Sequence, residues 1–287
     1  MINNTYLDEP MTLENLRAIQ AIKKASPNEV VNLSGNDFMR IELPNLDLSG
    51  YSLREIDLSG CQTLNKALLV INNADLSKAL LVESVFKGLS LNSSVINSID
   101  CTSAVLDGGC FDGTRGGGAI FQNTSLVKAS FIDIILNNAN FSGALLNSSV
   151  FKDGVSEDSD FSQATMNYAE MINIDAPYAD CERIKAYKLL IKDSYMQQGS
   201  FSHSEIFNSQ FINVKMTGNK FVKAKLTEVD FSDSDLTDVD FSGCILENCK
   251  FDGAKLQDTK FGDAIFINTD TSGENFKEAN FKSSKAA

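Results

Sequence analysis

The apolar positions of this chain recur every five residues over most of its length. From Leu76 onward, every fifth residue is large and apolar with few exceptions. The series comprises Leu76, Leu81, Phe86, Leu91, Ile96, Cys101, Leu106, Phe111, Phe121, Leu126, Phe131, Leu136, Phe141, Leu146, Phe151, Phe161, Met166, Met171, Phe201, Ile206, Phe211, Met216, Phe221, Leu226, Phe231, Leu236, Phe241, Leu246, Phe251, Leu256, Phe261, Phe266, Phe276 and Phe281. A small residue often stands two positions earlier, and Asp or Asn often lies between the two.

A period of five fits neither an α-helix nor a flat strand. Five residues turn an α-helix by about 500°, so successive large side chains would leave any single stripe. In a flat strand, every second large residue of this series would face outward. The chain must therefore bend once per five residues, so that the small and the large position point into one interior. Stacked coils then bury what a single unit cannot.

The alternation of Phe and Leu along the series sets the number of units in a coil. It adds a period of ten, which an even number of sides satisfies by stacking Phe on Phe and Leu on Leu. Four sides of five residues meet this condition, whereas three would mix the two residue types. The pattern predicts an all-β solenoid whose coils rise by one strand spacing, about 4.8 Å.

The repeating blocks resemble those of the pentapeptide-repeat family, whose consensus is A(D/N)Lxx. The blocks that carry the resemblance are ADLSK, ANFSG, VDFSD, SDLTD and VDFSG. The resemblance extends over residues 30–283, and dozens of units in phase make it specific. It implies a right-handed quadrilateral β-helix, with no catalytic machinery of its own.

Three segments interrupt the five-residue pattern. An earlier phase, from Leu33 to Leu58, changes to the later one near residues 59–70, which predicts a bulged corner within one solenoid. In residues 112–118, DGTRGGG, Gly116 occupies a position meant for a large residue; a distorted corner is favoured over a phosphate loop, because no P-loop pattern surrounds it. Ser156 occupies another such position, and a surface bulge is expected there.

Residues 174–200 are ambiguous. Ile184, Tyr187, Leu190 and Tyr195 fit a helical stripe, so a short helical excursion near residues 179–198 is slightly favoured. Against it, the five-residue phase survives from Met171 to Phe201, as a continuing solenoid requires.

The two ends of the chain are expected to differ from the repeats. Residues 1–29 form a separate segment with a helix over about Thr12 to Ala25, because apolar residues recur there every three positions. This helix is expected to cap the first coil, and binding to a partner is the alternative. No capping element follows Phe281, and residues 284–287 form a tail. The last coil therefore either pairs with a second copy as a homodimer or continues in a longer protein.

Composition and charge limit the classes of partner. The net charge of −13 disfavours direct binding to nucleic acid or anionic lipid, and no stretch approaches the roughly 20 apolar residues of a membrane span. The first residues do not resemble a secretory signal. Four cysteines, Cys101, Cys181, Cys244 and Cys249, fall on inward positions, and no zinc spacing occurs. The chain is expected in the cytoplasm, or in a host cell as an effector secreted without such a signal.

The sequence offers little chemistry for catalysis. His203 is the only histidine and stands at an outward position, so a catalytic triad has a single candidate base. Asp230, Asp235 and Asp240 fall on consecutive sides, where they should bond turn amides rather than act as an acid–base pair. The sequence therefore predicts no enzyme, no cofactor and no metal site.

The acidic residues are instead the candidate surface for a protein partner. They stand in two stretches without Lys or Arg, residues 153–182 and 226–247, whereas lysines cluster at 215–225 and 250–260. The candidate residues are Asp153, Glu157, Asp158, Asp160, Glu228, Asp230, Asp233, Asp235, Asp238 and Asp240. Two functions compete: a non-enzymatic protein-binding scaffold, as a bacterial effector or part of a larger protein, and an acidic DNA mimic that binds a type II topoisomerase. The resemblance implies the second, since quinolone-resistance members of the family act so.

Overall fold

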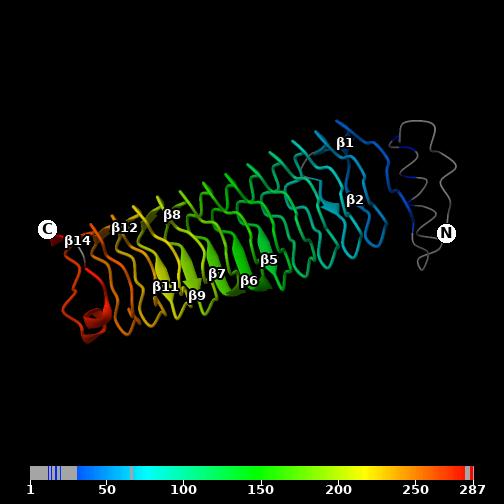
Figure 1. The fold of residues 1–287 in the computed structure, drawn as a ribbon. Helices are drawn as coiled ribbons and strands as arrows, with labels where there is room; N and C mark the ends of the chain where they lie inside the picture. The colour runs from blue at the N-terminus through cyan, green and yellow to red at the C-terminus, as the bar shows by residue number, and fades with distance from the viewer. Residues whose placement is uncertain are drawn as a thin grey trace. The chain divides into compact units, whose positions relative to one another are not determined.

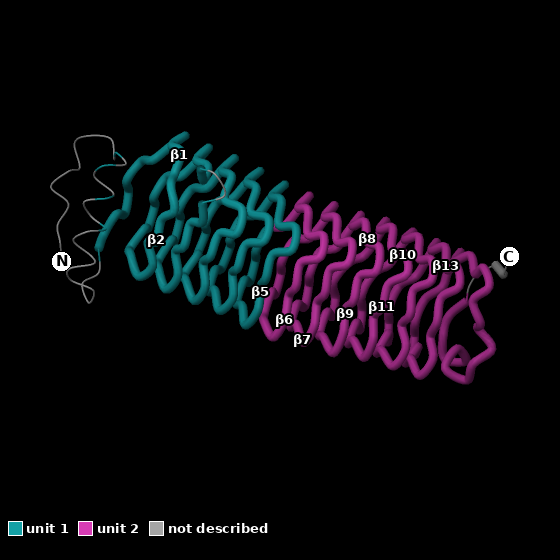
Figure 2. The backbone as a smooth tube through the Cα atoms, turned by 180° about the vertical axis from the view of Figure 1, so that it is seen from behind, with its two compact units in different colours: residues 1–140 teal, residues 141–287 magenta. Residues whose placement is uncertain are grey.

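The computed structural model describes residues 12, 14, 17, 20, 31–64, 67–281 and 285–286 (Figure 1). The chain divides into two compact units, unit 1 with residues 1–140 and unit 2 with residues 141–287 (Figure 2). Each unit is a parallel β-solenoid, because backbone segments from successive coils lie side by side and pair in parallel.

Four successive pairings complete one coil in each unit, as four sides of five residues require. In unit 1 the pairings of one coil are Asp75–Val95, Leu80–Asp100, Val85–Val105 and Ser90–Cys110. In unit 2 they are Asp160–Asp180, Thr165–Lys185, Glu170–Leu190 and Asp175–Tyr195. The predicted four-sided solenoid is confirmed.

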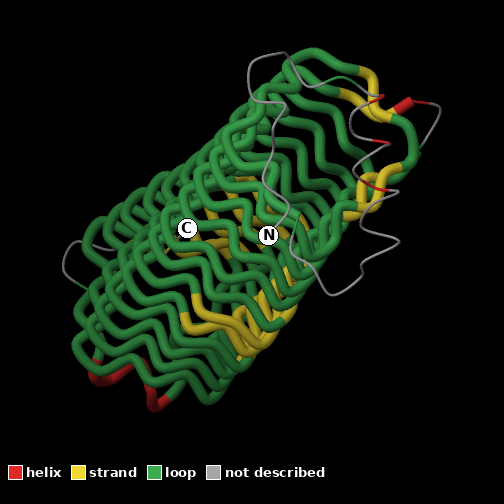
Figure 3. The backbone as a smooth tube through the Cα atoms, turned by 90° about the vertical axis from the view of Figure 1, so that its right-hand side faces the viewer, coloured by secondary structure: helices red, strands yellow, loops and turns green. Residues whose placement is uncertain are grey.

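The strands are short because two residues of every five form a corner. Most of the backbone therefore lies in turns and single bridges, drawn as green tube in Figure 3. Unit 1 contains β1 (Glu42–Leu43), β2 (Leu46–Asp47), β3 (Gln62–Thr63), β4 (Leu69–Val70) and β5 (Ser130–Ile132). Unit 2 contains β6 (Val150–Val155), β7 (Glu170–Asp175), β8 (Lys185–Tyr187), β9 (Leu190–Lys192), β10 (Glu205–Phe207), β11 (Gln210–Ile212), β12 (Lys225–Thr227), β13 (Ile245–Glu247), β14 (Ile265–Ile267), β15 (Lys285–Ala286) and the 3₁₀ helix η2 (Glu274–Glu278). Two parallel sheets of unit 2 have the orders β8–β10–β12–β13–β14–β15 and β6–β7–β9–β11.

The corners place one residue of each five-residue repeat in the left-handed backbone region. In the repeat centred on Leu76, the backbone amide of Ala79 donates to the carbonyl of Leu76 at 2.9 Å, and Lys78 between them has φ of 60°. Non-glycine residues rarely adopt this region, so the stacked coils must stabilise each corner. The side chains at these corners project outward and form the edges of the solenoid.

The interior is filled by columns in which identical side chains of successive coils stack on one another. Phe131, Phe141 and Phe151 are each fully buried, as the inward assignment predicts. Phe201 and Phe221 occupy the same position in successive coils and stack with ring centroids 4.9 Å apart at 7°. Phenylalanines half a coil apart, such as Phe201 and Phe211, meet edge to face instead. The predicted stacking of Phe on Phe is confirmed.

A three-residue insertion accounts for the change of phase in unit 1. Glu42 pairs with Gln62 in the regular register of one coil, whereas Leu46 pairs with Leu69, so the register has grown by three. The extra residues therefore lie between Thr63 and Leu69, inside a coil. The pairing continues on both sides of them.

The helical excursion predicted near residues 179–198 is wrong. Residues 185–187 and 190–192 are the strands β8 and β9, and the coil continues. Ile184 and Ile191 are buried, whereas Tyr187 and Tyr195 face outward. The apparent stripe arose because inward residues two and three positions apart in the repeat, together with outward tyrosines, mimic helical spacing.

Two other predicted distortions are also wrong. The backbone at Gly116 follows the regular coil, because the side chain of Ile96 occupies the space: a Cβ on Gly116 would lie 2.4 Å from Ile96 Cγ1. Ser156 is 1% exposed rather than part of a surface bulge. Its hydroxyl lies 2.8 Å from the Ser159 hydroxyl, so the two polar groups satisfy each other in the interior.

Neither of the two terminal expectations is tested by the described residues. The backbone is helical at Glu14, Arg17 and Gln20. The side-chain amide of Gln20 donates to the carbonyl of Asp47 at 3.1 Å. The apolar residues of the predicted cap lie outside the described residues, so capping stays a prediction. Near the other end, η2 replaces part of a coil, a feature that the sequence pattern did not indicate. Phe276 in this helix is buried, and pairing of the last coil with a second copy stays a prediction.

Candidate protein-binding edge

One corner of unit 2 carries an unusual set of outward side chains over several coils. It lies at the carboxyl ends of β8, β10, β12 and β13. Backbone hydrogen bonds join successive coils along it: Tyr168 N to Tyr187 O at 2.7 Å, Lys188 N to Phe207 O at 3.0 Å, Asn208 N to Thr227 O at 2.9 Å, and Glu228 N to Glu247 O at 2.8 Å. The corner is therefore a continuous, rigid edge.

Its first part, here called the tyrosine edge, consists of Tyr168, Tyr187, Lys188, Phe207 and Lys225. Tyr168 is 53% exposed and Tyr187 38%, and their rings meet edge to face with centroids 5.4 Å apart. The ammonium of Lys188 lies 5.7 Å from the centroid of the Tyr168 ring and 5.4 Å from that of Tyr187. The ammonium of Lys225 lies 5.4 Å from the centroid of the Phe207 ring. Cation–π contacts of this kind hold the rings in place, and both tyrosine side chains remain exposed.

Two further exposed tyrosines belong to other parts of unit 2. Tyr178 lies at a different corner, where its amide donates to Gln197, and Tyr195 pairs with Lys215 along another side. Each is 50% exposed. They do not extend the tyrosine edge, and they provide controls for its role.

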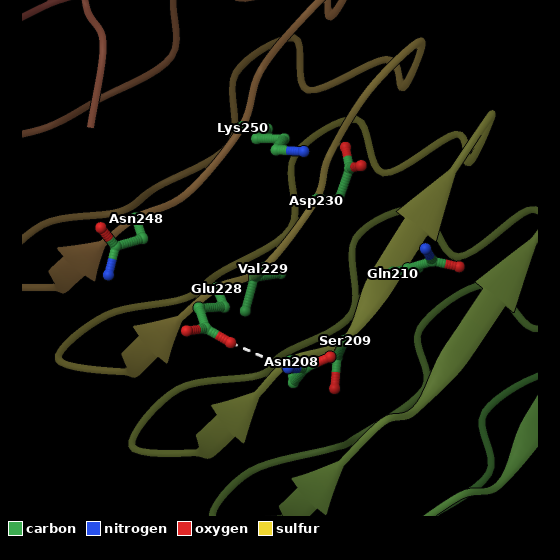
Figure 4. Close-up of a pocket in the computed structure, with 8 residues that line it drawn as sticks. All are labelled: Asn208, Ser209, Gln210, Glu228, Val229, Asp230, Asn248 and Lys250. Atoms are coloured by element: carbon green, nitrogen blue, oxygen red, sulfur yellow. Dashed lines mark hydrogen bonds between the residues drawn. The ribbon is translucent and has the colours of Figure 1, made fainter. Parts of the chain in front are cut away.

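The second part of the corner is a polar pocket of about 370 Å³, here called the amide pocket (Figure 4). Its lining residues are Asn208, Ser209, Gln210, Glu228, Val229, Asp230, Asn248 and Lys250. Asn208 Nδ2 donates to Glu228 Oε2 at 2.8 Å between adjacent coils. The hydroxyl of the buried Ser209 accepts from the Leu189 amide at 3.0 Å and donates to the carbonyl of Phe207 at 2.8 Å, so it fixes the pocket wall.

The composition of the pocket is suited to binding. It presents carboxylate, amide and ammonium groups without histidine or cysteine. His203 is exposed at another corner, and within the described part of the chain no three His, Cys, Asp or Glu residues gather to hold a metal ion. Burial raises the pKa of the Cys249 thiol to about 12, so this cysteine is protonated and unreactive at neutral pH.

The predicted acidic residues 228–240, here called the acidic ring, extend over three successive sides of one coil and do not gather on one side. Asp230, Asp235 and Asp240 pair with different neighbours along separate sides of unit 2. Each accepts a hydrogen bond from a turn amide two residues later, from Ser232 at 2.9 Å, Thr237 at 3.2 Å and Ser242 at 2.8 Å. The local role predicted for these carboxylates is confirmed. Of the ring, the amide pocket includes Glu228 and Asp230.

Lysines one coil away compensate much of this acidic ring. Asp235 lies between Lys215 and Lys255 in the parallel register, and Asp240 lies between Lys220 and Lys260. Lys255 Nζ is 3.6 Å from Asp235 Oδ2, and Lys260 Nζ is 2.7 Å from Asp238 Oδ1. Desolvation raises the pKa of Asp235, but hydrogen bonds from Thr237 and the charge of Lys255 outweigh it, and the net shift is downward. Lysines and carboxylates that are banded along the sequence thus alternate in space.

The other four predicted residues lie in the first coils of unit 2. Asp153 Oδ1 accepts from Asn173 Nδ2 at 2.8 Å at one corner. Asp160 pairs directly with Asp180 in the next coil, and Glu157 and Asp158 precede Asp160 at the adjoining corner. We call Glu157, Asp158, Asp160, Asp180 and Glu182 the acidic side, because they cover one side and its two corners.

Burial of Asp180, together with like-charge contact on the acidic side, predicts a pH-dependent stability. Desolvation by burial is the largest effect that raises the pKa of Asp180, and the charges of Glu182 and Asp160 raise it further. The hydrogen bond from the Glu182 backbone amide lowers this pKa, but the net shift is upward. A raised folded-state pKa favours folding at low pH, and this contribution is lost as the pH rises through that pKa. Asp180→Asn, which keeps an acceptor for the Glu182 amide, should therefore raise the melting temperature slightly at pH 7.

The pH profile of thermal unfolding provides the control for this prediction. Below about pH 3, Asp180 is protonated in both the folded and the unfolded state. The Asp180→Asn variant and the unmodified chain should therefore have the same melting temperature there. An equal gain at both pH values would show that ionisation of Asp180 is not the cause.

The sequence interpretation missed the tyrosine edge and the amide pocket. The signal was a column of positions that recur once per coil, occupied by Tyr168, Lys188, Asn208, Glu228 and Asn248. Each has a positive φ between 50° and 59° and projects from the same corner. Spacing by one whole coil therefore identifies side chains that share an edge.

None of the helices among the described residues has the length and apolar character needed to cross a membrane. The model of the pentapeptide-repeat family matches residues 117–153 and 234–273, with eight copies of the repeat. No curated protein matches the sequence.

Among solved structures, the chain is similar to HetL, a pentapeptide-repeat protein involved in heterocyst differentiation regulation from the cyanobacterium Nostoc sp. strain PCC 7120. The identity is 18% over 88% of this chain and 98% of that chain, with a TM-score of 0.31. It is also similar to QnrB1, a plasmid-mediated fluoroquinolone resistance protein, with 18% identity over 77% of this chain and 90% of that chain and a TM-score of 0.41.

Proposed function

We propose that this pentapeptide-repeat protein is a non-enzymatic scaffold that binds another protein through the tyrosine edge of unit 2. The observation that carries the proposal is the exposed aromatic pair Tyr168 and Tyr187, held against each other beside a polar pocket. Exposed, preorganised tyrosines are enriched among the residues that dominate binding energy at protein interfaces.

The rigidity of the edge favours binding. Successive coils are joined by backbone hydrogen bonds along the whole corner, and Lys188 fixes both tyrosine rings. A partner would therefore order few side chains of the scaffold on binding, which reduces the entropic cost of association. Among the described residues, the interior of each unit is filled with buried side chains and leaves no deep cleft for a substrate, which supports a surface function.

The double substitution of Tyr168 and Tyr187 by serine tests this proposal. Both residues are outward at a corner or a strand end, so the substitutions should leave the fold intact. Proteins from the native host are captured on the full-length chain and identified, and the affinity of each is then measured with purified components. The partner should bind the double variant at least about tenfold more weakly.

Tyr178→Ser is the matched control, because Tyr178 is similarly exposed at a different corner. It should retain the affinity of the unmodified chain. Equal affinity of the double variant and the unmodified chain for every captured partner would reject the tyrosine edge as the binding surface.

The acidic side supports a second candidate function, a DNA-like surface that engages a type II topoisomerase. Five carboxylates cover one side and its corners, and Asp160 lies directly against Asp180. The ring at residues 228–240 adds less to this surface, because lysines alternate with it. In a DNA gyrase supercoiling assay, the chain at micromolar concentration should inhibit the enzyme or protect it from a quinolone. If the chain neither inhibits the enzyme nor protects it, this candidate function is rejected.

A further inference from the structure

We propose that the amide pocket receives the guanidinium group of an arginine from the protein bound at the tyrosine edge. The inference rests on the proposed function and adds the chemistry of the partner. It is carried by the acceptor groups of the pocket, its size and its position on the edge.

The pocket offers negative charge and acceptors. Its lining includes two carboxylates, Glu228 and Asp230, and one cation, Lys250. The Asn208 side-chain amide donates a hydrogen bond to Oε2 of Glu228, and the Ser232 backbone amide donates one to Oδ1 of Asp230. Each carboxylate therefore retains its second oxygen for a ligand. Side-chain carbonyls of Asn208, Asn248 and Gln210 add further acceptors. An anionic ligand would meet two carboxylates and is disfavoured.

The choice of arginine over lysine follows from geometry. A guanidinium is planar and carries five N–H donors, so it can engage carboxylate and amide oxygens in several directions at once. An ammonium is compact, and that of Lys250 already points towards Asp230 (Figure 4). At about 370 Å³, the pocket is also larger than a single small ion requires.

The pocket continues the tyrosine edge without a break. Phe207 belongs to the edge and its neighbour Asn208 lines the pocket, with the ammonium of Lys225 over the Phe207 ring. A partner segment that lies on the tyrosines can therefore extend one side chain along the same corner to Glu228. The two parts together would form one interface with an aromatic contact and an arginine anchor.

The test uses the full-length chain and three blocked tripeptides as probes: acetyl-Gly-Arg-Gly-amide and its lysine and citrulline counterparts. Citrulline has the shape of arginine without its charge. In an NMR titration, the arginine probe should shift the side-chain amide signals of Asn208 and Asn248. Both other probes should bind more weakly.

The decisive variant is Glu228→Gln, which preserves an acceptor for Asn208 and removes the charge. It should weaken binding of the arginine probe about tenfold, as expected for loss of a charge-assisted hydrogen bond. The matched control is Glu83→Gln, because Glu83 is also exposed at a corner with φ of 56°, close to the 55° of Glu228. It should have no effect.

Equal binding of the arginine and lysine probes, or an arginine affinity unchanged in Glu228→Gln, would overturn this inference. Either result would leave the proposed function intact if the captured partner still depends on Tyr168 and Tyr187. Conversely, arginine binding without such a partner would support the pocket chemistry and reject the tyrosine edge as a protein-binding surface.

Discussion

Replacing Phe221 by alanine is expected to lower the free energy of unfolding of unit 2 by about 3–5 kcal/mol. The ring is fully buried and lies in a column between Phe201 and Phe241, with centroids 4.9 Å away on both sides. It also meets Phe211 and Phe231 edge to face. Removing it leaves a cavity that the rigid coils cannot close, because backbone pairing fixes their spacing.

Urea unfolding followed by circular dichroism measures this loss, and Phe207→Ala is the control. Phe207 is outward at the end of β10 and only partly buried, so its replacement should affect stability much less. Similar losses for the two variants would contradict the assignment of inward and outward positions.

The second large effect is expected at Gly199, which occupies a small inward position. A Cβ there would lie 2.5 Å from the carbonyl oxygen of Ala179 in the preceding coil, and a backbone atom cannot move aside cheaply. The Gly199 amide also donates to Asn219 Oδ1 of the following coil at 2.9 Å, so Gly199 is held between its two neighbouring coils. Gly199→Ala should therefore cost about 1–3 kcal/mol of stability.

Gly117→Ala is the matched control for Gly199→Ala. The nearest atom to a Cβ on Gly117 is Asn97 Oδ1 at 3.8 Å, an ordinary contact. This substitution should be neutral or stabilising, because alanine restricts the unfolded chain. Equal urea midpoints for Gly199→Ala and the unmodified chain would show that the coils separate more easily than their register indicates.

The five-residue period, together with the alternation of Phe and Leu, was sufficient to predict the four-sided solenoid and its columns of Phe. Such a pattern leaves few alternatives, since one interior must accept both the small and the large position of every unit. The same reasoning failed at Gly116 and Ser156, where a neighbouring side chain compensates: Ile96 fills the space above the glycine, and Ser159 pairs with the serine. This compensation acts between successive coils or within a corner, so single positions do not reveal it.

The candidate site likewise depends on which residues of successive coils lie side by side, and the linear sequence does not show this directly. Counting charges along the sequence identified acidic stretches, but Asp235 and Asp240 alternate with lysines of the adjacent coils. Glu228 and Asp230 were selected for their charge alone, whereas their position in a pocket that adjoins the tyrosine edge follows from the coil. Tyr187 was assigned to a helix, although it lies at the end of β8 and belongs to the tyrosine edge.

Site-specific photo-crosslinking tests the proposed binding edge most directly. A photoreactive phenylalanine analogue is placed at Tyr187 in one sample and at Tyr178 in another, and each chain is irradiated with the captured partner. Crosslinks to the partner should form from position 187 and not from position 178. Crosslinks that form from position 178, or equally from both, would contradict the placement of the partner on the tyrosine edge.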